Sequence, residues 1–247
     1  MKVKLSGWLI AVASVLFAVA GSVGVASPAY AAPCPDVQVV FARGTFEPPG
    51  VGATGQAFVD ALTAKAANKT IDVYPVDYPA SIDFATAADG VIDASNKITD
   101  TAATCPKTKI VIGGYSQGAA VAAYLTEDAV PQGFNLPPGL TGPMPPSVAD
   151  HVAAVALFGK PSSGFMQMIY SGAPPITVGP RYTAKTTEQC IQDDPVCSPG
   201  GGNNSAHGQY IADGLTDQAA DFAVSKLPRG GSGRPPAPPA PVEQAAS

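Results

Sequence analysis

The chain has 247 residues, of which 13% are charged, and its formal net charge at pH 7 is −5. Without Lys2 and Lys4, which belong to an expected leader, 12 basic residues stand against 19 acidic ones, a net charge of −7. This excess of acid argues against nucleic acid as a partner, because binding to phosphates depends on Lys and Arg.

The first 31 residues have the pattern of a signal peptide. Lys2 and Lys4 give a positive start, "GWLIAVASVLFAVAG" an apolar core, and "SPAYAA" a small-residue site for cleavage after Ala31. An uncleaved membrane anchor is the alternative, but the apolar run is short for a span. We therefore expect a secreted protein, free or associated with the cell wall, with no membrane span after processing.

Strand-like and helix-like segments alternate along the rest of the chain. We expect strands over 37–44, 70–78, 109–116 and 151–161 and a weaker one within 176–189, with helices over 54–68, from Ser81 or Asp83 to about 103, over 117–129 and over 208–226. This alternation predicts a doubly wound, mainly parallel five-stranded sheet with helices on both faces. Thr54 is the expected N-cap of the first helix.

Two segments fall outside this pattern. Residues 131–150 are rich in Pro and Gly and are expected to form a surface loop, and 228–247 have no apolar periodicity and are expected to form a disordered tail. Residues 32–227 then form a single domain, a size that one domain can reach. Nothing in the sequence indicates oligomerisation, so we expect a monomer.

The expected mature chain contains four cysteines, an even number that in an exported protein indicates two disulfides. Three pairings are possible. Cys190 and Cys197 are the natural local pair, which leaves Cys34 to reach Cys105. A zinc site is not expected, because the nearest two cysteines are seven positions apart and zinc sites favour closer spacing.

The pattern G-x-S-x-G occurs once, in Gly114-Tyr115-Ser116-Gln117-Gly118, between an expected strand and an expected helix. In that context it indicates the sharp turn that exposes a nucleophilic serine in α/β-hydrolases. Glycines two residues to either side let strand and helix approach closely, and the helix start offers free N–H groups to an oxyanion. A structural turn with an incidental serine is the alternative.

A nucleophilic serine needs a base, and the chain has two histidines. His151 opens an expected strand, whereas His207 lies in "NNSAHGQY", late in the chain. The order serine, acid, histidine of α/β-hydrolases favours His207. The acid must lie between Ser116 and His207, where the candidates are Glu127, Asp128, Asp150, Glu188, Asp193 and Asp194. Asp193 and Asp194 follow the last expected strand inside "CIQDDPVC", and these arguments leave the two open.

The residues resemble the cutinase family, including its actinobacterial relatives. The resemblance is carried by "FARGT", "GYSQG", "CIQDDPVC", "AHGQY" and the four cysteines, across about 34–227. In that family the acid lies three residues before the second cysteine of the short loop, which selects Asp194. The resemblance also implies the pairs Cys34–Cys105 and Cys190–Cys197. It places the oxyanion hole at Gln117 and at Thr45, where serine is more usual.

The resemblance implies a secreted serine esterase that uses Ser116, His207 and Asp194 on carboxylic esters of short to medium acyl chains, at a lipid or polyester surface. No cofactor and no metal are required. Two alternatives stay open: a carbohydrate deacetylase similar to acetylxylan esterase, and a cell-envelope binding protein that has lost activity. The loop 131–150 and the tail lie outside the compact family pattern and could shade or extend the site.

Overall fold

The computed structural model describes residues 33–228. The expected signal peptide, 1–31, and all but the first residue of the expected tail lie outside this range. Within it, no helix combines the length and the apolar character that a membrane crossing requires.

The described chain forms a five-stranded sheet in the order β2-β1-β3-β4-β5, and all neighbouring strands are parallel. The predicted fold class is therefore confirmed. The elements in chain order are β1 (Val37–Ala42), α1 (Gly52–Lys65), β2 (Ile71–Pro75), η1 (Phe84–Thr86), α2 (Ala87–Thr104), β3 (Lys109–Tyr115), α3 (Gln117–Tyr124), η2 (Pro146–Asp150), β4 (Val152–Phe158), α4 (Ser163–Ile169), η3 (Thr183–Lys185), β5 (Thr186–Gln189), η4 (Ala206–Gly208) and α5 (Leu215–Lys226).

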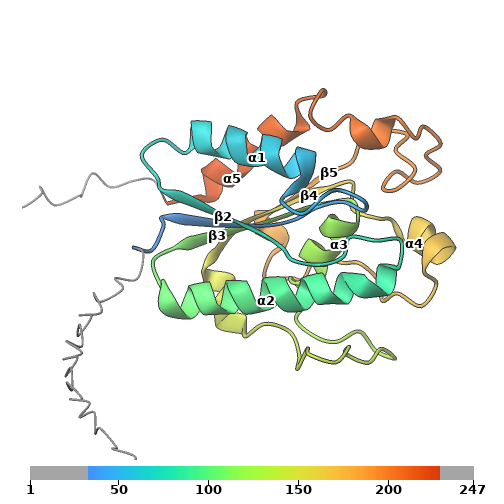
Figure 1. The fold of residues 1–247 in the computed structure, drawn as a ribbon, viewed down its shortest axis with the longest axis horizontal. Helices are drawn as coiled ribbons and strands as arrows, with labels where there is room; N and C mark the ends of the chain where they lie inside the picture. The colour runs from blue at the N-terminus through green and yellow to red at the C-terminus, as the bar shows by residue number, and fades with distance from the viewer. Residues whose placement is uncertain (1–32, 229–247) are drawn as a thin grey trace, which may run out of the picture. The chain divides into compact units, whose positions relative to one another are not determined.

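Helices cover both faces of the sheet, α1 and α5 on one face and α2 and α3 on the other (Figure 1). Alternate residues of β1 divide between the two cores. Val39 and Phe41 pack into the cluster under α1 and α5, whereas Val40 packs into the cluster under α2 and α3. All residues of β1 and β4 are buried, as expected for parallel strands covered on both sides.

Helix α3 lies unusually close to the sheet, and two glycines permit this. A Cβ at Gly118 would stand 2.0 Å from the carbonyl oxygen of Ala42 at the end of β1. A Cβ at Gly114 would stand 2.0 Å from the carbonyl oxygen of Gly118. Because both obstacles are backbone atoms, no side-chain movement can relieve them. The contact therefore requires glycine at both positions.

Several helix boundaries differ from the sequence prediction: α1 ends at Lys65, not at 68, and α2 begins at Ala87, after the short helix η1 that Asp83 caps. Helix α3 ends at Tyr124, not at 129, because the chain turns there and the buried Thr126 hydroxyl donates to the Ala123 carbonyl. Helix α5 begins at Leu215, not at 208, after Gly214 adopts the left-handed conformation. Helix α1 begins at Gly52, which places Thr54 in its first turn and not at its N-cap.

Helix α4 was not predicted. It has seven residues, too few for an amphipathic pattern to stand out. Its start is fixed by Ser162, whose hydroxyl accepts the N–H of Phe165 at 3.2 Å. That cap was the one signal in the sequence.

The contact between α3 and β1 can be tested by Gly118→Ala. The added methyl group would overlap the Ala42 carbonyl, so we expect a loss of about 3 kcal/mol or more in the free energy of unfolding. Gly164→Ala, in α4, is the matched control because its Cβ would enter open space. Urea unfolding measures both variants, and equal midpoints for the two would contradict this account of the packing.

Candidate active site

Ser116 sits on the turn between β3 and α3, in a backbone conformation that side chains rarely adopt. Its φ and ψ are 54° and −118°. Its N–H donates to the carbonyl of Phe158 in β4 at 2.8 Å, and its own carbonyl accepts from Ala119 at 2.9 Å. The turn lies at the carboxyl edge of the sheet beside β1, where the strand order reverses, the usual place for a ligand in such folds.

Three side chains meet at this turn in one hydrogen-bonded chain. His207 Nε2 lies 2.9 Å from Ser116 Oγ, and His207 Nδ1 lies 2.8 Å from Asp194 Oδ2. Asp194 is fully buried, and its other oxygen accepts the N–H of Val196 at 2.8 Å. This is the nucleophile, base and acid arrangement of α/β-hydrolases.

The structure separates Asp194 from Asp193. Asp193 has a positive φ of 69°, which turns its carboxylate toward Gly202, whose N–H it accepts at 2.9 Å. Asp194 points the other way, toward His207. One residue of the pair thus holds the loop and the other meets the histidine.

The remaining candidates lie apart from Ser116. His151 precedes β4 and therefore lies at the amino ends of the strands, whereas Ser116 lies at their carboxyl ends. The seven residues of β4 separate the two ends by about 20 Å. The carboxylates of Glu127, Asp128 and Glu188 are engaged elsewhere, with Thr177, Arg181 and Lys160 respectively. Asp150 ends η2, next to His151.

The imidazole of His207 is held in place from two sides. Its ring stacks on Tyr115, with ring centroids 5.0 Å apart, and the Tyr115 hydroxyl donates to the His207 carbonyl at 2.6 Å. On the other side the ring lies against the backbone of Gly159. The approach is so close that a Cβ at this position would come within 2.9 Å of the imidazole. These contacts leave the ring little freedom to turn away from Ser116.

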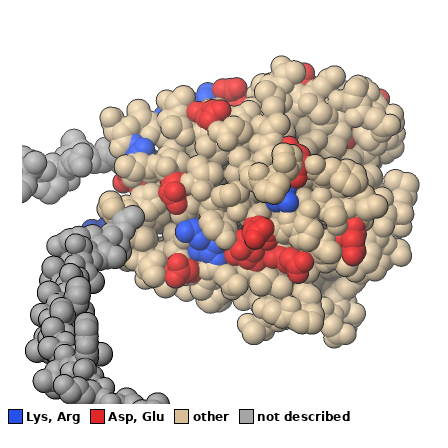
Figure 2. All heavy atoms as spheres, in the orientation of Figure 1, with Lys and Arg blue, Asp and Glu red and all other residues tan. Residues whose placement is uncertain are grey.

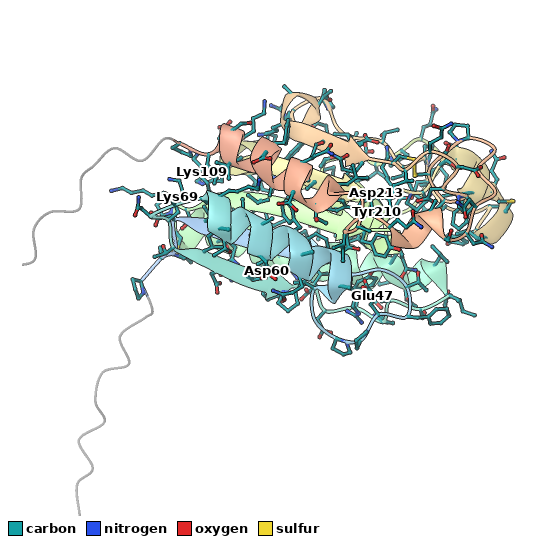
Figure 3. All side chains as sticks on the ribbon, turned by 90° about the horizontal axis from the view of Figure 1, so that it is seen from above. Glu47, Asp60, Lys69, Lys109, Tyr210 and Asp213 are labelled. Atoms are coloured by element: carbon teal, nitrogen blue, oxygen red, sulfur yellow. A yellow bond between two sulfur atoms is a disulfide. The ribbon has the colours of Figure 1, made fainter. Side chains whose placement is uncertain are left out.

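Tyr210 is a member of the site that sequence reasoning missed. Its hydroxyl donates to Asp194 Oδ2 at 2.6 Å, so the same carboxylate oxygen is hydrogen-bonded to both Tyr210 and His207. Burial, and next the hydrogen bond to Asp194, raise the pKa of Tyr210, which keeps it protonated and a donor. Figure 3 shows Tyr210 at the same end of the molecule as Glu47, with Lys69 and Lys109 at the other end. The feature of the sequence that could have revealed Tyr210 is its position, three residues after His207.

Thr45 lies in a tight turn after β1 that is fixed by its neighbours. Glu47 accepts the N–H groups of Gly44 and Ala53 at 2.6 and 2.8 Å. The buried Arg43 donates to the carbonyls of Glu47 and Tyr78 at 2.8 and 2.6 Å. The backbone hydrogen bonds of this turn come from Phe46 and Glu47, and none of them uses the N–H of Thr45.

Gln117 is the first residue of α3, so its N–H has no partner within the helix. Its side chain donates to the carbonyl of Ser81 at 2.9 Å and thereby ties the turn to the loop before α2. The following residue, Gly118, abuts the end of β1, so the segments that carry Gln117 and Thr45 adjoin. The N–H of Gln117 thus directly follows Ser116, and the N–H of Thr45 lies in the adjoining segment.

Two disulfides are present, Cys34–Cys105 and Cys190–Cys197. The first joins the chain before β1 to the end of α2 and closes a long loop, with a sequence separation of 71. The second closes a loop with a separation of 7 that contains Asp194. Disulfides are typical of proteins that fold in an oxidising environment.

The fold and the serine turn define a protein of the α/β-hydrolase class. The family model described as Cutinase matches residues 33–227, and the chain belongs to the cutinase family. It is a carboxylic ester hydrolase, as its named relatives indicate.

Carboxylesterase Culp1 of Mycobacterium tuberculosis is 50% identical over 204 residues, which cover 82% of this chain and 87% of that protein. Probable carboxylesterase Culp5 of the same organism is 52% identical over 176 residues, 71% of this chain and 98% of that one. Among solved structures, Trichoderma reesei cutinase in complex with a phosphonate inhibitor aligns with a TM-score of 0.57 and 32% identity over 80% of this chain and 78% of that one. An acetylxylan esterase aligns with a TM-score of 0.63 and 26% identity over 79% and 100%.

The two disulfides should differ in what their loss changes. In Cys34→Ser/Cys105→Ser we expect a loss of roughly 4 kcal/mol in unfolding free energy and unchanged activity of the folded protein, because the bridge lies far from Ser116. In Cys190→Ser/Cys197→Ser we expect a smaller loss, roughly 2.5 kcal/mol, with a larger fall in kcat because the Asp194 loop loosens. Urea unfolding and hydrolysis of p-nitrophenyl butyrate measure the two effects. Equal losses of kcat in the two variants would contradict the distinction.

Proposed function

We propose that this protein is a secreted serine esterase in which Ser116 is the nucleophile, His207 the general base and Asp194 the acid. The observation that carries the proposal is the unbroken hydrogen-bonded chain from Ser116 Oγ through His207 to the buried Asp194. A serine hydroxyl is a weak nucleophile until a base removes its proton, and His207 Nε2 is within reach to do so.

The proposed reaction has two halves. His207 takes the proton of Ser116 as its oxygen attacks the ester carbonyl, and Asp194 stabilises the imidazolium that forms. His207 then gives this proton to the leaving alcohol, which leaves an acyl group on Ser116. Water, activated by His207, attacks the acyl-enzyme in the second half and releases the acid.

The N–H groups of Thr45 and Gln117 are proposed to bind the oxyanion. Such donors stabilise the transition state most when they are fixed before the reaction begins, and one donor contributes about 3 kcal/mol. The hydrogen bonds of Arg43 and Glu47 fix the Thr45 turn, and the start of α3 fixes Gln117. The pathway draws on no metal or cofactor.

Lipid or polyester esters are proposed as substrates on the basis of the surface near Ser116. Phe46, next to Thr45, is 76% exposed, and Ile82, next to the Ser81 carbonyl that Gln117 contacts, is 72% exposed. Ile211, four residues after His207, is also exposed. Figure 2 shows charged side chains gathered over α2 but none over α4, whose sequence has no charged residue. Such a surface suits contact with an apolar, uncharged material.

A carbohydrate deacetylase is the second candidate, favoured by the fold shared with an acetylxylan esterase. The two functions differ in acyl chain length, since a deacetylase removes acetyl groups alone. Secretion is proposed from the expected leader and the two disulfides, with 32–227 as the catalytic domain of a monomer.

The proposed nucleophile is tested by Ser116→Ala in purified protein. Without the hydroxyl no acyl-enzyme can form, so we expect kcat/KM for p-nitrophenyl butyrate to fall about 10⁴-fold or more with no change in unfolding midpoint. Ser225→Ala, on the far helix α5, is the control and should retain full activity. Residual hydrolysis in Ser116→Ala at a tenth of the original rate would refute the assignment, and hydrolysis of acetate esters alone would favour the deacetylase.

Tyr210 is expected to position Asp194. Tyr210→Phe removes one donor from a buried carboxylate, and we expect kcat for p-nitrophenyl butyrate to fall about tenfold with little change in KM. In an Asp194→Asn background the same substitution should cost nothing further, because its effect passes through Asp194. Tyr74→Phe is the matched control, since Tyr74 donates to Asp93 at 2.8 Å away from Ser116. Additive losses in the double variant would contradict this role.

A further inference from the structure

Tyr115 is the last residue of β3 and directly precedes Ser116. Its half-buried side chain packs against the core cluster on the face of the sheet that α1 and α5 cover. There it contacts two segments that are far apart in the sequence, the turn after β1 and the segment that carries His207. One side chain therefore lies between the segments that are proposed to supply the oxyanion hole and the base.

The turn after β1 rests against the ring of Tyr115. A Cβ at Gly44 would stand 2.7 Å from Cδ1 and 2.9 Å from Cε1 of this ring, distances that real Cβ atoms essentially never show. The backbone of Gly44 is therefore in direct contact with the ring. Because Gly44 directly precedes Thr45, the place of the ring limits where the Thr45 turn can lie.

The same ring holds His207 by its side chain and by its backbone. The imidazole stacks on Tyr115 at an interplanar angle of 26°, and the Tyr115 hydroxyl donates to the His207 carbonyl at 2.6 Å. Burial, and next the charges of Glu47 and Asp194, raise the pKa of Tyr115 to about 12, so its hydroxyl remains a donor at neutral pH. Tyr210 contacts the Tyr115 ring edge-on, with ring centroids 5.8 Å apart. The ring is thus fixed among the groups that surround His207.

We propose that Tyr115 is a positioning residue that couples the Thr45 turn to the imidazole of His207. The inference rests on the proposed function, in which the base and the oxyanion donors act on the same ester carbonyl. A misplacement of about 1 Å in such groups can reduce a rate about a hundredfold. Because the Tyr115 ring contacts both segments, a shift of this ring changes the position of both groups.

The coupling is tested by Gly44→Ala, whose added methyl group would overlap the Tyr115 ring. Gly44 is not among the glycines with positive φ, so alanine fits its backbone conformation. We expect kcat for p-nitrophenyl butyrate to fall about tenfold or more, with KM within about twofold of wild type. Gly164→Ala is the control for the added methyl group, since its Cβ enters open space, and it should change neither constant.

Tyr115→Val shows whether the effect of Gly44→Ala passes through the ring. Valine suits a strand and has no atom at the positions of Cδ1 and Cε1, so the methyl group of Gly44→Ala then meets no ring. Tyr115→Val alone should lower kcat about tenfold, and adding Gly44→Ala to it should cost less than about twofold more.

Tyr115→Phe separates the ring from the hydroxyl. It keeps the stacking on the imidazole and loses the hydrogen bond to the His207 carbonyl, so we expect kcat to fall only about threefold. Tyr124→Phe is the matched control, because it also removes a hydroxyl that donates to a carbonyl, that of Pro174 at 2.7 Å. It should leave kcat unchanged. A loss in Tyr115→Phe as large as that in Tyr115→Val would contradict a role for the ring itself.

Urea unfolding establishes that each variant is folded before the rates are compared. Equal costs of Gly44→Ala in wild type and in Tyr115→Val would overturn the coupling and leave Ser116-dependent hydrolysis standing. If Tyr115→Val does not fold, Gly44→Ala decides alone, and a kcat within about twofold of wild type overturns the coupling. If hydrolysis by wild type does not depend on Ser116, the proposed function fails and the coupling fails with it.

Discussion

The close contact between α3 and the ends of β1 and β3 is the constraint on which the site depends. Because Gly118 and Gly114 have no Cβ, the first turn of α3 can rest against the carbonyl of Ala42. This contact brings the start of α3 beside the turn that carries Thr45. It also requires the chain to reverse direction within one residue, and Ser116 is that residue, with its φ of 54°. Backbone strain of this kind persists only where surrounding packing maintains it.

The buried Asp194 imposes the second constraint. A carboxylate with no exposure must be fully hydrogen-bonded, since an unpaired buried charge is very costly. Val196, Tyr210 and His207 supply the partners, and all three come from the chain around the short disulfide and the turn after it. Burial raises the pKa of Tyr210 and so keeps the donor that this carboxylate needs. The same hydrogen bonds that make burial tolerable also orient the acid toward the histidine.

The sequence predicted the sheet and the serine turn because both are local patterns. Continuous apolar runs identify covered parallel strands, and glycines around Ser116 identify the close contact. The choice between Asp193 and Asp194 was beyond such reasoning without the family resemblance, because neighbouring residues differ here only in backbone conformation, with Asp193 at a φ of 69°. Tyr210 was missed because its partner lies 16 positions away across a disulfide loop. Helix α4 was missed because seven residues carry too little periodicity.

Substrate preference must reside outside the elements that this chain shares with its structural neighbours. A cutinase and an acetylxylan esterase both align over about four fifths of the chain, so the common sheet and turn do not by themselves decide which ester is the substrate. The segment after α3 differs from these shared elements, because it leaves the sheet and covers a largely apolar cavity between α2 and α3. A loop of this kind can change size without disturbing the strained turn or the buried acid. Substrate preference can therefore vary while the strained turn and the buried carboxylate stay fixed.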